Sequence, residues 1–162
     1  MSFSHFDSDG RAIMVDVSGK QPALRIAIAE ARVCMQSSTL DLIRSGMAAK
    51  GDVLGVARLA GIAAAKKTSD LIPLTHPLAI HAVSVEFEVD AHNATIIVRS
   101  KVSAIERSGM EMEAMVSASL AALTLYDMCK GVDRGISISE VSLLYKEGGK
   151  SGVYRKKEGT DA

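Results

Sequence analysis

The chain contains several runs in which two sets of side chains alternate. Residues 24–35 alternate throughout, and a period of two predicts a long strand. Residues 82–89 and 94–102 alternate on either side of a polar turn, which predicts a hairpin. Residues 136–145 predict a last strand, and the shorter run 14–18 predicts a strand ahead of the others.

Helical patterns lie between these runs. Ser38 marks the start of a short helix, and the run 52–67, which opens on an aspartate, predicts a second one. Gly55 and Gly61 indicate that this second helix packs closely against a neighbour. A stretch rich in Met, Ala and Leu over 111–132 predicts a long third helix.

The predicted order is strand, helices, strand, strand, helix, strand, which corresponds to two split βαβ units. It favours an α+β fold, namely a ferredoxin-like antiparallel sheet with helices packed on one face. Residues 1–162 contain no interdomain linker, so a single domain is expected. The polar, glycine-containing ends 1–12 and 148–162 are expected to be mobile.

The charged and aromatic content of the chain limits the classes of partner that it can bind. Among 162 residues, 19 are Lys or Arg and 19 are Asp or Glu, so no whole-molecule field attracts nucleic acid or a membrane, and an anionic ligand needs a local cluster of cations. Only 4% of residues are aromatic, and the hairpin offers only Phe87 for stacking on a base. The sequence predicts neither a nucleic-acid partner nor a membrane partner.

The two cysteines, Cys34 and Cys129, cannot form a metal cluster alone, and one disulfide would be an unusual framework for a chain of this size. No bound metal is predicted. The chain starts with a polar segment that lacks a secretory or transit pattern, and its apolar runs are too short to cross a bilayer. A cytoplasmic location is therefore expected.

The long helix carries the most informative polar side chains. Glu113, Asp127 and Lys130 share one face, and apolar neighbours suggest that Asp127 and Lys130 are partly buried and act as a proton-transfer pair. The alternative is an ordinary i,i+3 ion pair at a solvated helix end. Glu113 lies about 21 Å from Asp127 along the axis. Either the two acids contact opposite ends of an extended ligand, or Glu113 completes the site of a neighbouring subunit.

Other candidates are less specific. His76 lies between two prolines that restrict its loop, although a purely structural histidine is common in such a setting. Lys50 precedes a helix start, where amide groups and positive charge suit phosphate. The GGKSG segment at 148–152 is not a phosphate-binding Walker loop, because Leu144 stands where that motif needs glycine. The segment either folds over an anion or is a solvated tail.

Several segments together carry a resemblance to a known family. They are MVDVS at 14–18, KGDV at 50–53, DLIPLTHPL at 70–78, EMEA at 111–114, AALTLYDMCK at 121–130 and GGKSG at 148–152. In this order and spacing they resemble the cyclic pyranopterin monophosphate synthases, the molybdenum cofactor biosynthesis protein C family. The resemblance covers nearly the whole chain.

The resemblance implies a ferredoxin-like subunit in a homohexamer, a trimer of dimers with active sites between subunits. It also implies a reaction: 3',8-cyclo-7,8-dihydroguanosine 5'-triphosphate is rearranged to cyclic pyranopterin monophosphate, and diphosphate is released. No tightly bound cofactor is expected, although Mg2+ can arrive with the substrate triphosphate.

The resemblance also implies residue roles. Asp127 matches the central acid/base residue, and Lys130 matches its proton donor or charge stabiliser. Family members often carry Cys where Thr75 stands, so a reactive thiol there is not essential to this chain. The substrate-binding residues implied by the resemblance are Lys50, Leu74, Thr75, His76, Met112 and Glu113. A triphosphate also needs cations around it, which adds Arg107 and Lys150 to the predicted substrate-binding set.

A non-catalytic, nucleotide-binding regulatory oligomer is the alternative, because ferredoxin-like domains also serve as small-molecule sensors. The acid and lysine at 127 and 130 favour the enzyme. The two hypotheses differ in outcome, since a regulator would bind the nucleotide and leave it intact.

Overall fold

The structure, a computed structural model, describes residues 5–46 and 50–157. Its centre is a five-stranded antiparallel sheet in the order β2-β3-β1-β4-β5. The strands are β1 (Ala23–Cys34), β2 (Ala82–Asp90), β3 (Thr95–Glu106), β4 (Ser137–Glu147) and β5 (Tyr154–Arg155). The first four strands have the connectivity of a split βαβ pair, which confirms the predicted ferredoxin-like α+β class.

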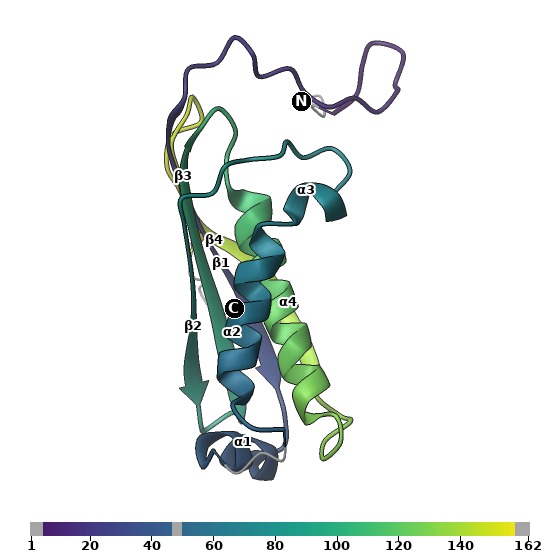
Figure 1. Cartoon of the computed structure of the whole chain (residues 1–162), viewed down its shortest axis with the longest axis vertical. Helices are drawn as coiled ribbons and strands as arrows, with labels where there is room; N and C mark the ends of the chain where they lie inside the picture. Colours follow the sequence, from purple (N-terminus) through teal and green to yellow (C-terminus); the bar gives the residue numbers. More distant parts are fainter. Residues whose placement is uncertain (1–4, 47–49, 158–162) are drawn as a thin grey trace.

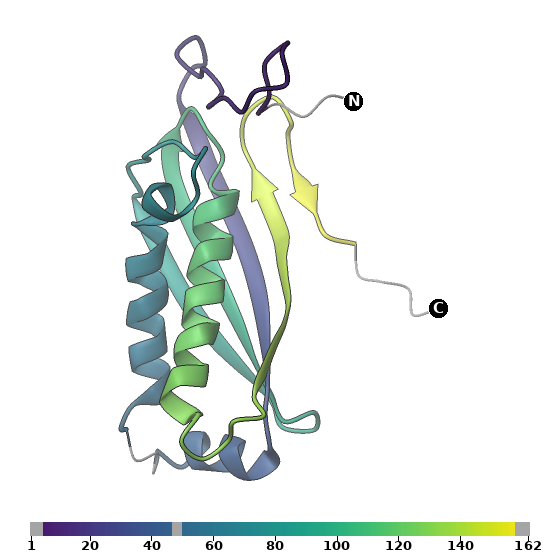
Figure 2. The same cartoon turned by 90° about the vertical axis from the view of Figure 1, so that its right-hand side faces the viewer.

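The helices are α1 (Ser37–Arg44), α2 (Val53–Ala65), α3 (Thr68–Leu71) and α4 (Glu111–Cys129). Helices α2 and α4 lie side by side on one face of the sheet, as Figures 1 and 2 show. The short helix α1 lies at the end of the molecule where α4 terminates, and α3 lies near the other end (Figure 1). Helix α4 therefore links two distant ends of the fold.

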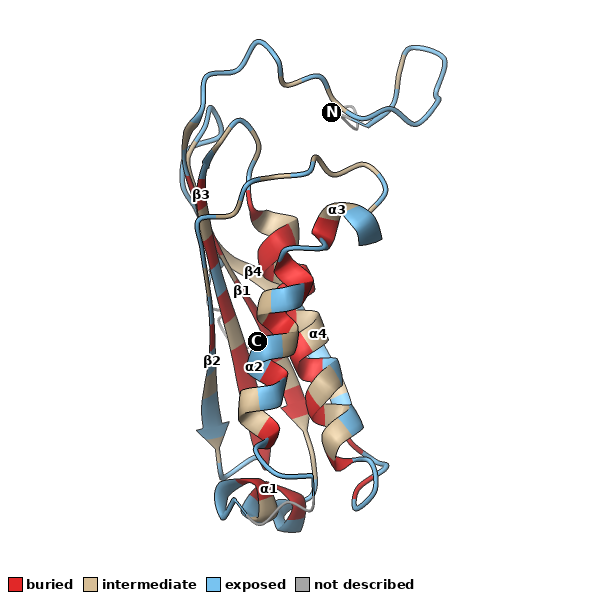
Figure 3. Ribbon diagram, viewed as in Figure 1, coloured by how far each residue is buried: buried red, intermediate tan, exposed pale blue. Residues whose placement is uncertain are grey.

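The core lies between the sheet and this helical layer (Figure 3). Alanines line both sides: Ala27 and Ala29 on β1, and Ala118 and Ala121 on α4, are completely buried. Small side chains let the helix approach the sheet closely. Gly61 of α2 does the same between helices, because a Cβ there would lie 3.0 Å from the carbonyl oxygen of Ser117 and 3.2 Å from the Cβ of Ala121. Close packing at Gly61 was predicted correctly.

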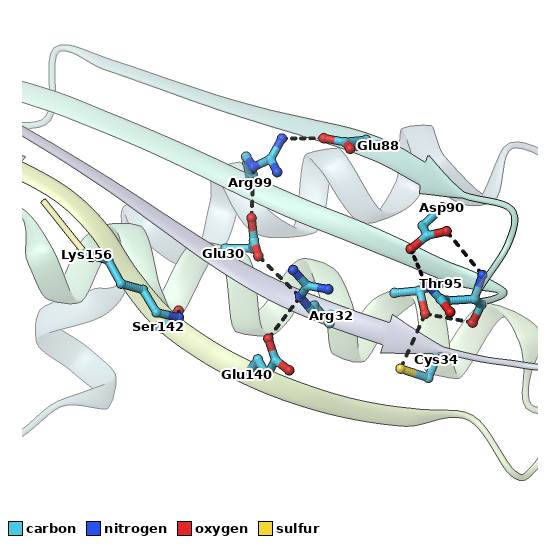
Figure 4. A network of polar contacts seen from close by, with 11 residues as sticks. Glu30, Arg32, Cys34, Glu88, Asp90, Thr95, Arg99, Glu140, Ser142 and Lys156 are labelled. Carbon is cyan, nitrogen blue, oxygen red and sulfur yellow. Dashed lines mark hydrogen bonds and ion pairs between the residues drawn. The ribbon is translucent and has the colours of Figure 1, made fainter. Parts of the chain in front are cut away.

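The sheet face away from the helices carries an ion-pair network, shown in Figure 4. Arg99 of β3 donates to Glu30 of β1 at 2.9 Å and also pairs with Glu88 of β2. Arg32 lies 3.0 Å from Glu140 and 3.4 Å from Glu30. Glu30 is only 6% exposed, and its charge is balanced by one arginine on β1 and one on β3.

Two local predictions need correction. Residues 14–18 do not form a strand: the Asp16 carboxylate accepts a hydrogen bond from the Ser18 amide, a local turn that competes with strand pairing. Helix α1 begins at Ser37 with Gln36 as its N-cap, so Ser38 is already helical.

The expected mobility of the two ends stays a prediction. Residues 1–4 and 158–162 lie outside the described residues. Among the described terminal residues, Phe6 bridges Ala12, and β5 pairs with β4 through Tyr154 and Arg155.

Candidate functional site

The predicted site residues form two groups at opposite ends of α4. Glu113 lies in the first turn of this helix, and Asp127 in its last turn. The axial separation expected for one continuous helix, about 21 Å, therefore holds. Lys50, Asp127 and Lys130 form the group at the α1 end, which we call the acid–lysine cluster.

Within the acid–lysine cluster, Asp127 lies between two ammonium groups. Lys130 Nζ is 2.6 Å from Asp127 Oδ1, and Lys50 Nζ is 3.8 Å from Oδ2. Lys50 also donates a hydrogen bond of 2.8 Å to the main-chain carbonyl of Asp127. Two cations from different segments thus converge on one carboxylate.

The prediction that Asp127 and Lys130 are partly buried is wrong for the single chain. The Asp127 and Lys130 side chains are 58% and 52% exposed, because α4 ends here and no described segment covers them. The hydrogen bond and charge of Lys130, followed by the charge of Lys50, lower the pKa of Asp127. The same hydrogen bond raises the pKa of Lys130. Both groups are therefore ionised at neutral pH.

The other end of α4 borders a cavity of about 340 Å³. The Nε2 of His76 donates to the Val15 carbonyl at 2.8 Å, since a carbonyl can only accept, and Nδ1 lies 3.4 Å from the Ser108 hydroxyl. The histidine thus joins the N-terminal segment to the loop ahead of α4. The cavity brings together five of the predicted substrate-binding residues, namely Leu74, Thr75, His76, Met112 and Glu113.

Glu113 lines this cavity, and its carboxyl group has a raised pKa. It is 3% exposed, and burial raises its pKa to about 7, with a smaller contribution from the charge of Glu111. A carboxyl with such a pKa exchanges a proton near neutral pH. Sequence reasoning gave Glu113 a binding role only and missed this property.

A larger cavity of about 860 Å³ adjoins the first, and Lys20, Ser108 and Glu111 line both. The two remaining predicted residues, Arg107 and Lys150, line the larger cavity. Three further cations were not predicted there: Lys20, Arg25 and Lys146. We call these five side chains the cationic cavity set.

The position of Arg25 in the alternating pattern of β1 could have marked it as a functional residue. It occupies a position of β1 whose alternate neighbours, Ala27 and Ala29, face the core, and an arginine in such a register is unusual. Its guanidinium donates to the main-chain carbonyls of Glu106 and Arg107, at 3.0 and 3.1 Å. These bonds fix the strand end on which the cavity is built.

The GGKSG segment packs against this arginine. Gly149 has φ +74°, a conformation in which other residues are strained, and a Cβ there would lie 1.8 Å from Nη1 of Arg25, so a larger residue would displace the guanidinium. Lys146 donates to the Ser151 hydroxyl at 2.9 Å and pairs with Glu111 at the same distance. The segment thus borders the cavity in the described residues.

Comparison with known proteins decides the family. A family model described as the MoaC family matches residues 14–149, most of the chain. This chain belongs to the MoaC family. Proteins named cyclic pyranopterin monophosphate synthase are similar to it over 98% of its length and 99% of theirs. They include those of Pelobacter propionicus at 67% identity, Geotalea uraniireducens at 66% and Geobacter sulfurreducens at 63%.

Membership of the MoaC family favours the enzyme over the regulatory oligomer, because the similar proteins carry the name of a synthase. Among the described residues, no group of three or more His, Cys, Asp or Glu side chains is arranged to hold a metal ion. No helix in residues 5–46 and 50–157 has the length and apolar character needed to cross a membrane.

Proposed function

We propose that this MoaC family chain is a cytoplasmic enzyme of molybdenum cofactor biosynthesis. Its reaction converts 3',8-cyclo-7,8-dihydroguanosine 5'-triphosphate to cyclic pyranopterin monophosphate and releases diphosphate. The observation that carries this proposal is the near full-length similarity to proteins named for that product. The two cavities and the acid–lysine cluster supply groups suited to the chemistry.

The acid–lysine cluster suits proton transfer. Ring opening and closure move protons between nitrogen and oxygen atoms, which requires a base and an acid at the same bond. Asp127 is the base, because its lowered pKa keeps it ionised, and Lys130 is the acid. Covering the pair by substrate and a neighbouring subunit would remove water and bring both pKa values closer to neutrality.

The cationic cavity set suits the triphosphate. Lys20, Arg25, Arg107, Lys146 and Lys150 oppose fewer acidic side chains, and the N-terminus of α4 lies at the same wall. Mg2+ would enter with the triphosphate, held partly by phosphate oxygens. The protein's contribution is to bind and orient the phosphates while a sugar hydroxyl attacks the first phosphorus.

The two ends of α4 belong to different sites in this proposal. Glu113 and Asp127 are too far apart to act on one bond, so each site combines the cavities of one subunit with the acid–lysine cluster of another. This arrangement requires an oligomer, and we propose a homohexamer built as a trimer of dimers. Sedimentation should then give six times the chain mass of 17.1 kDa.

Turnover of the purified protein tests the function. The protein is incubated with the cyclised dihydroguanosine triphosphate and Mg2+, and diphosphate and pterin product are followed together. Both should appear in equal amounts with wild type, and Asp127→Asn should reduce kcat by at least about 100-fold while it still binds substrate. Binding without loss of the nucleotide in wild type would contradict the enzyme and favour the regulatory oligomer.

A further inference from the structure

Asp133, in the loop between α4 and β4, is a buried carboxylate outside the groups described above. It is 2% exposed. Its Oδ2 accepts from the Gln36 amide at 2.9 Å and from the Thr39 hydroxyl at 3.1 Å. Its Oδ1 accepts from the Gln36 side chain at 3.3 Å and from the Gly135 amide at 3.0 Å. Two segments nearly a hundred residues apart meet at one side chain.

Asp133 makes the hydrogen bond that an acid at the third helical position makes in a capping box. The N-cap residue of α1, Gln36, makes no side-chain cap hydrogen bond, and Asp133 accepts from the main-chain amide of Gln36. These hydrogen bonds, led by that of the Gln36 amide, lower the pKa of Asp133, so a charged group holds the helix start.

The loop of Asp133 is continuous with the helix end that carries the acid–lysine cluster. The amides of Val132 and Asp133 both donate to the Cys129 carbonyl, at 2.9 and 3.1 Å. Asp127 and Lys130 lie on either side of Cys129 in the chain. A shift of the Asp133 loop would therefore also shift the last turn of α4.

Lys50 reaches the cluster from the other side of this junction. It follows α1 in the chain, and its ammonium group bonds to the Asp127 carbonyl at 2.8 Å. The thiol of Cys129 lies near enough to both Asp133 and Lys50 for their charges to affect its pKa. Burial raises this pKa, the charge of Asp133 raises it further, and the charge of Lys50 lowers it. The junction held by Asp133 thus joins the end of α4, which carries Asp127 and Lys130, to helix α1, which precedes Lys50 in the chain.

We propose that Asp133 is a positioning residue that locks the end of α4 to the start of α1 and so holds Lys50 against Asp127. The effect on turnover rests on the proposed function, whereas the effect on the Lys50–Asp127 contact does not. Asp133 touches no reacting atom in this account.

A double-mutant cycle tests the proposal. Asp133→Asn keeps the shape but replaces one acceptor with a donor. We expect kcat to fall about 10- to 100-fold and KM to change much less, because the cationic cavity set is untouched. In a Lys50→Ala background the same change should lower kcat no further. Multiplicative losses would overturn the proposal.

A readout independent of turnover is the carboxyl titration of Asp127, followed by 13C NMR. Asp133→Asn should raise the pKa of Asp127 towards its ordinary value, because part of its lowering comes from Lys50. An unchanged titration in a folded variant would overturn the proposal, even if the wild type makes no pterin.

Two variants separate positioning from general damage. Asp90→Asn changes a carboxylate that also accepts hydrogen bonds, from Asn93 in the hairpin turn, and should leave kcat and the Asp127 titration at wild-type values. If Asp133→Asn fails to fold, Thr39→Val removes only one hydroxyl donor from Asp133 and should give a smaller change of the same sign. No change in either readout with Thr39→Val would then count against the proposal.

Discussion

The carboxylates of this chain show how environment divides the roles of similar side chains. Asp127 is exposed and paired with lysines, so its pKa is lowered. Glu113 is buried, and this burial raises its pKa to about 7. The first is a carboxylate and the second holds a proton near neutral pH. In the proposed shared site, these two acids come from different subunits.

Glu113 makes stability depend on pH. Because its pKa is higher in the folded chain than the ordinary 4.5, its contribution is fully present below pH 4.5 and is lost as the pH rises through about 7. The loss is at most about 3 kcal/mol. Glu113→Gln should flatten this slope in denaturant unfolding at fixed protein concentration. Glu86→Gln, on an exposed position of β2, should retain it.

Arg107 tests the cationic cavity set. Its guanidinium donates to the Lys20 carbonyl and lines the larger cavity, at a distance from the acid–lysine cluster. Arg107→Ala should raise KM about 10-fold, the equivalent of one lost charge-assisted contact, with kcat changed much less. Arg58→Ala, which removes an arginine that stacks on Phe87 away from the cavity, is the matched control. Equal KM values in both variants would contradict the assignment.

At the scale of elements, the packing of α2 on α4 depends on Gly61. A larger side chain would meet the Ser117 carbonyl and Val85, both at 3.0 Å from a Cβ. Gly61→Val should therefore lower the free energy of unfolding by about 1–3 kcal/mol in urea titrations. Gly131→Ala serves as control, because a Cβ there meets nothing within 4 Å. Equal stability of the two variants would show that the contact is not tight.

The elements that could be predicted are those with a strong period. β1 and the hairpin alternate because one sheet face packs on helices, and α4 is long and apolar because it covers that face. Residues 14–18 alternate too, but they find no partner strand. β5 was not predicted, because a two-residue strand has no period and is defined by its pairing with β4.

The site was predictable in part, for related reasons. The resemblance named residues at the smaller cavity and at the acid–lysine cluster, the need for cations around a triphosphate added Arg107 and Lys150 at the larger cavity, and helix spacing separated Glu113 from Asp127. The exposure of Asp127 escaped prediction because it depends on where the neighbouring segments end. Asp133 escaped it because Gln36 and Thr39 lie far away in the sequence, and Lys20 and Lys146 escaped it because the cavity that they line is built from distant segments.

The whole molecule is built around one helix with a different chemical group at each end. The two cavities and buried Glu113 lie at the start of α4, and the exposed acid–lysine cluster lies at its other end. In the proposed mechanism, the groups at the two ends of α4 are too far apart to act on one bond, so neighbouring subunits complete each site.

Mixing two inactive variants tests whether the sites are shared between subunits. Glu113→Ala and Asp127→Ala proteins are combined under conditions in which subunit exchange is demonstrated independently, and pterin formation is measured. Shared sites predict that activity returns in the mixture, because some sites combine an intact cavity with an intact acid–lysine cluster. If exchange is complete and the mixture stays as inactive as either variant alone, each site lies within one subunit and the sites are not shared.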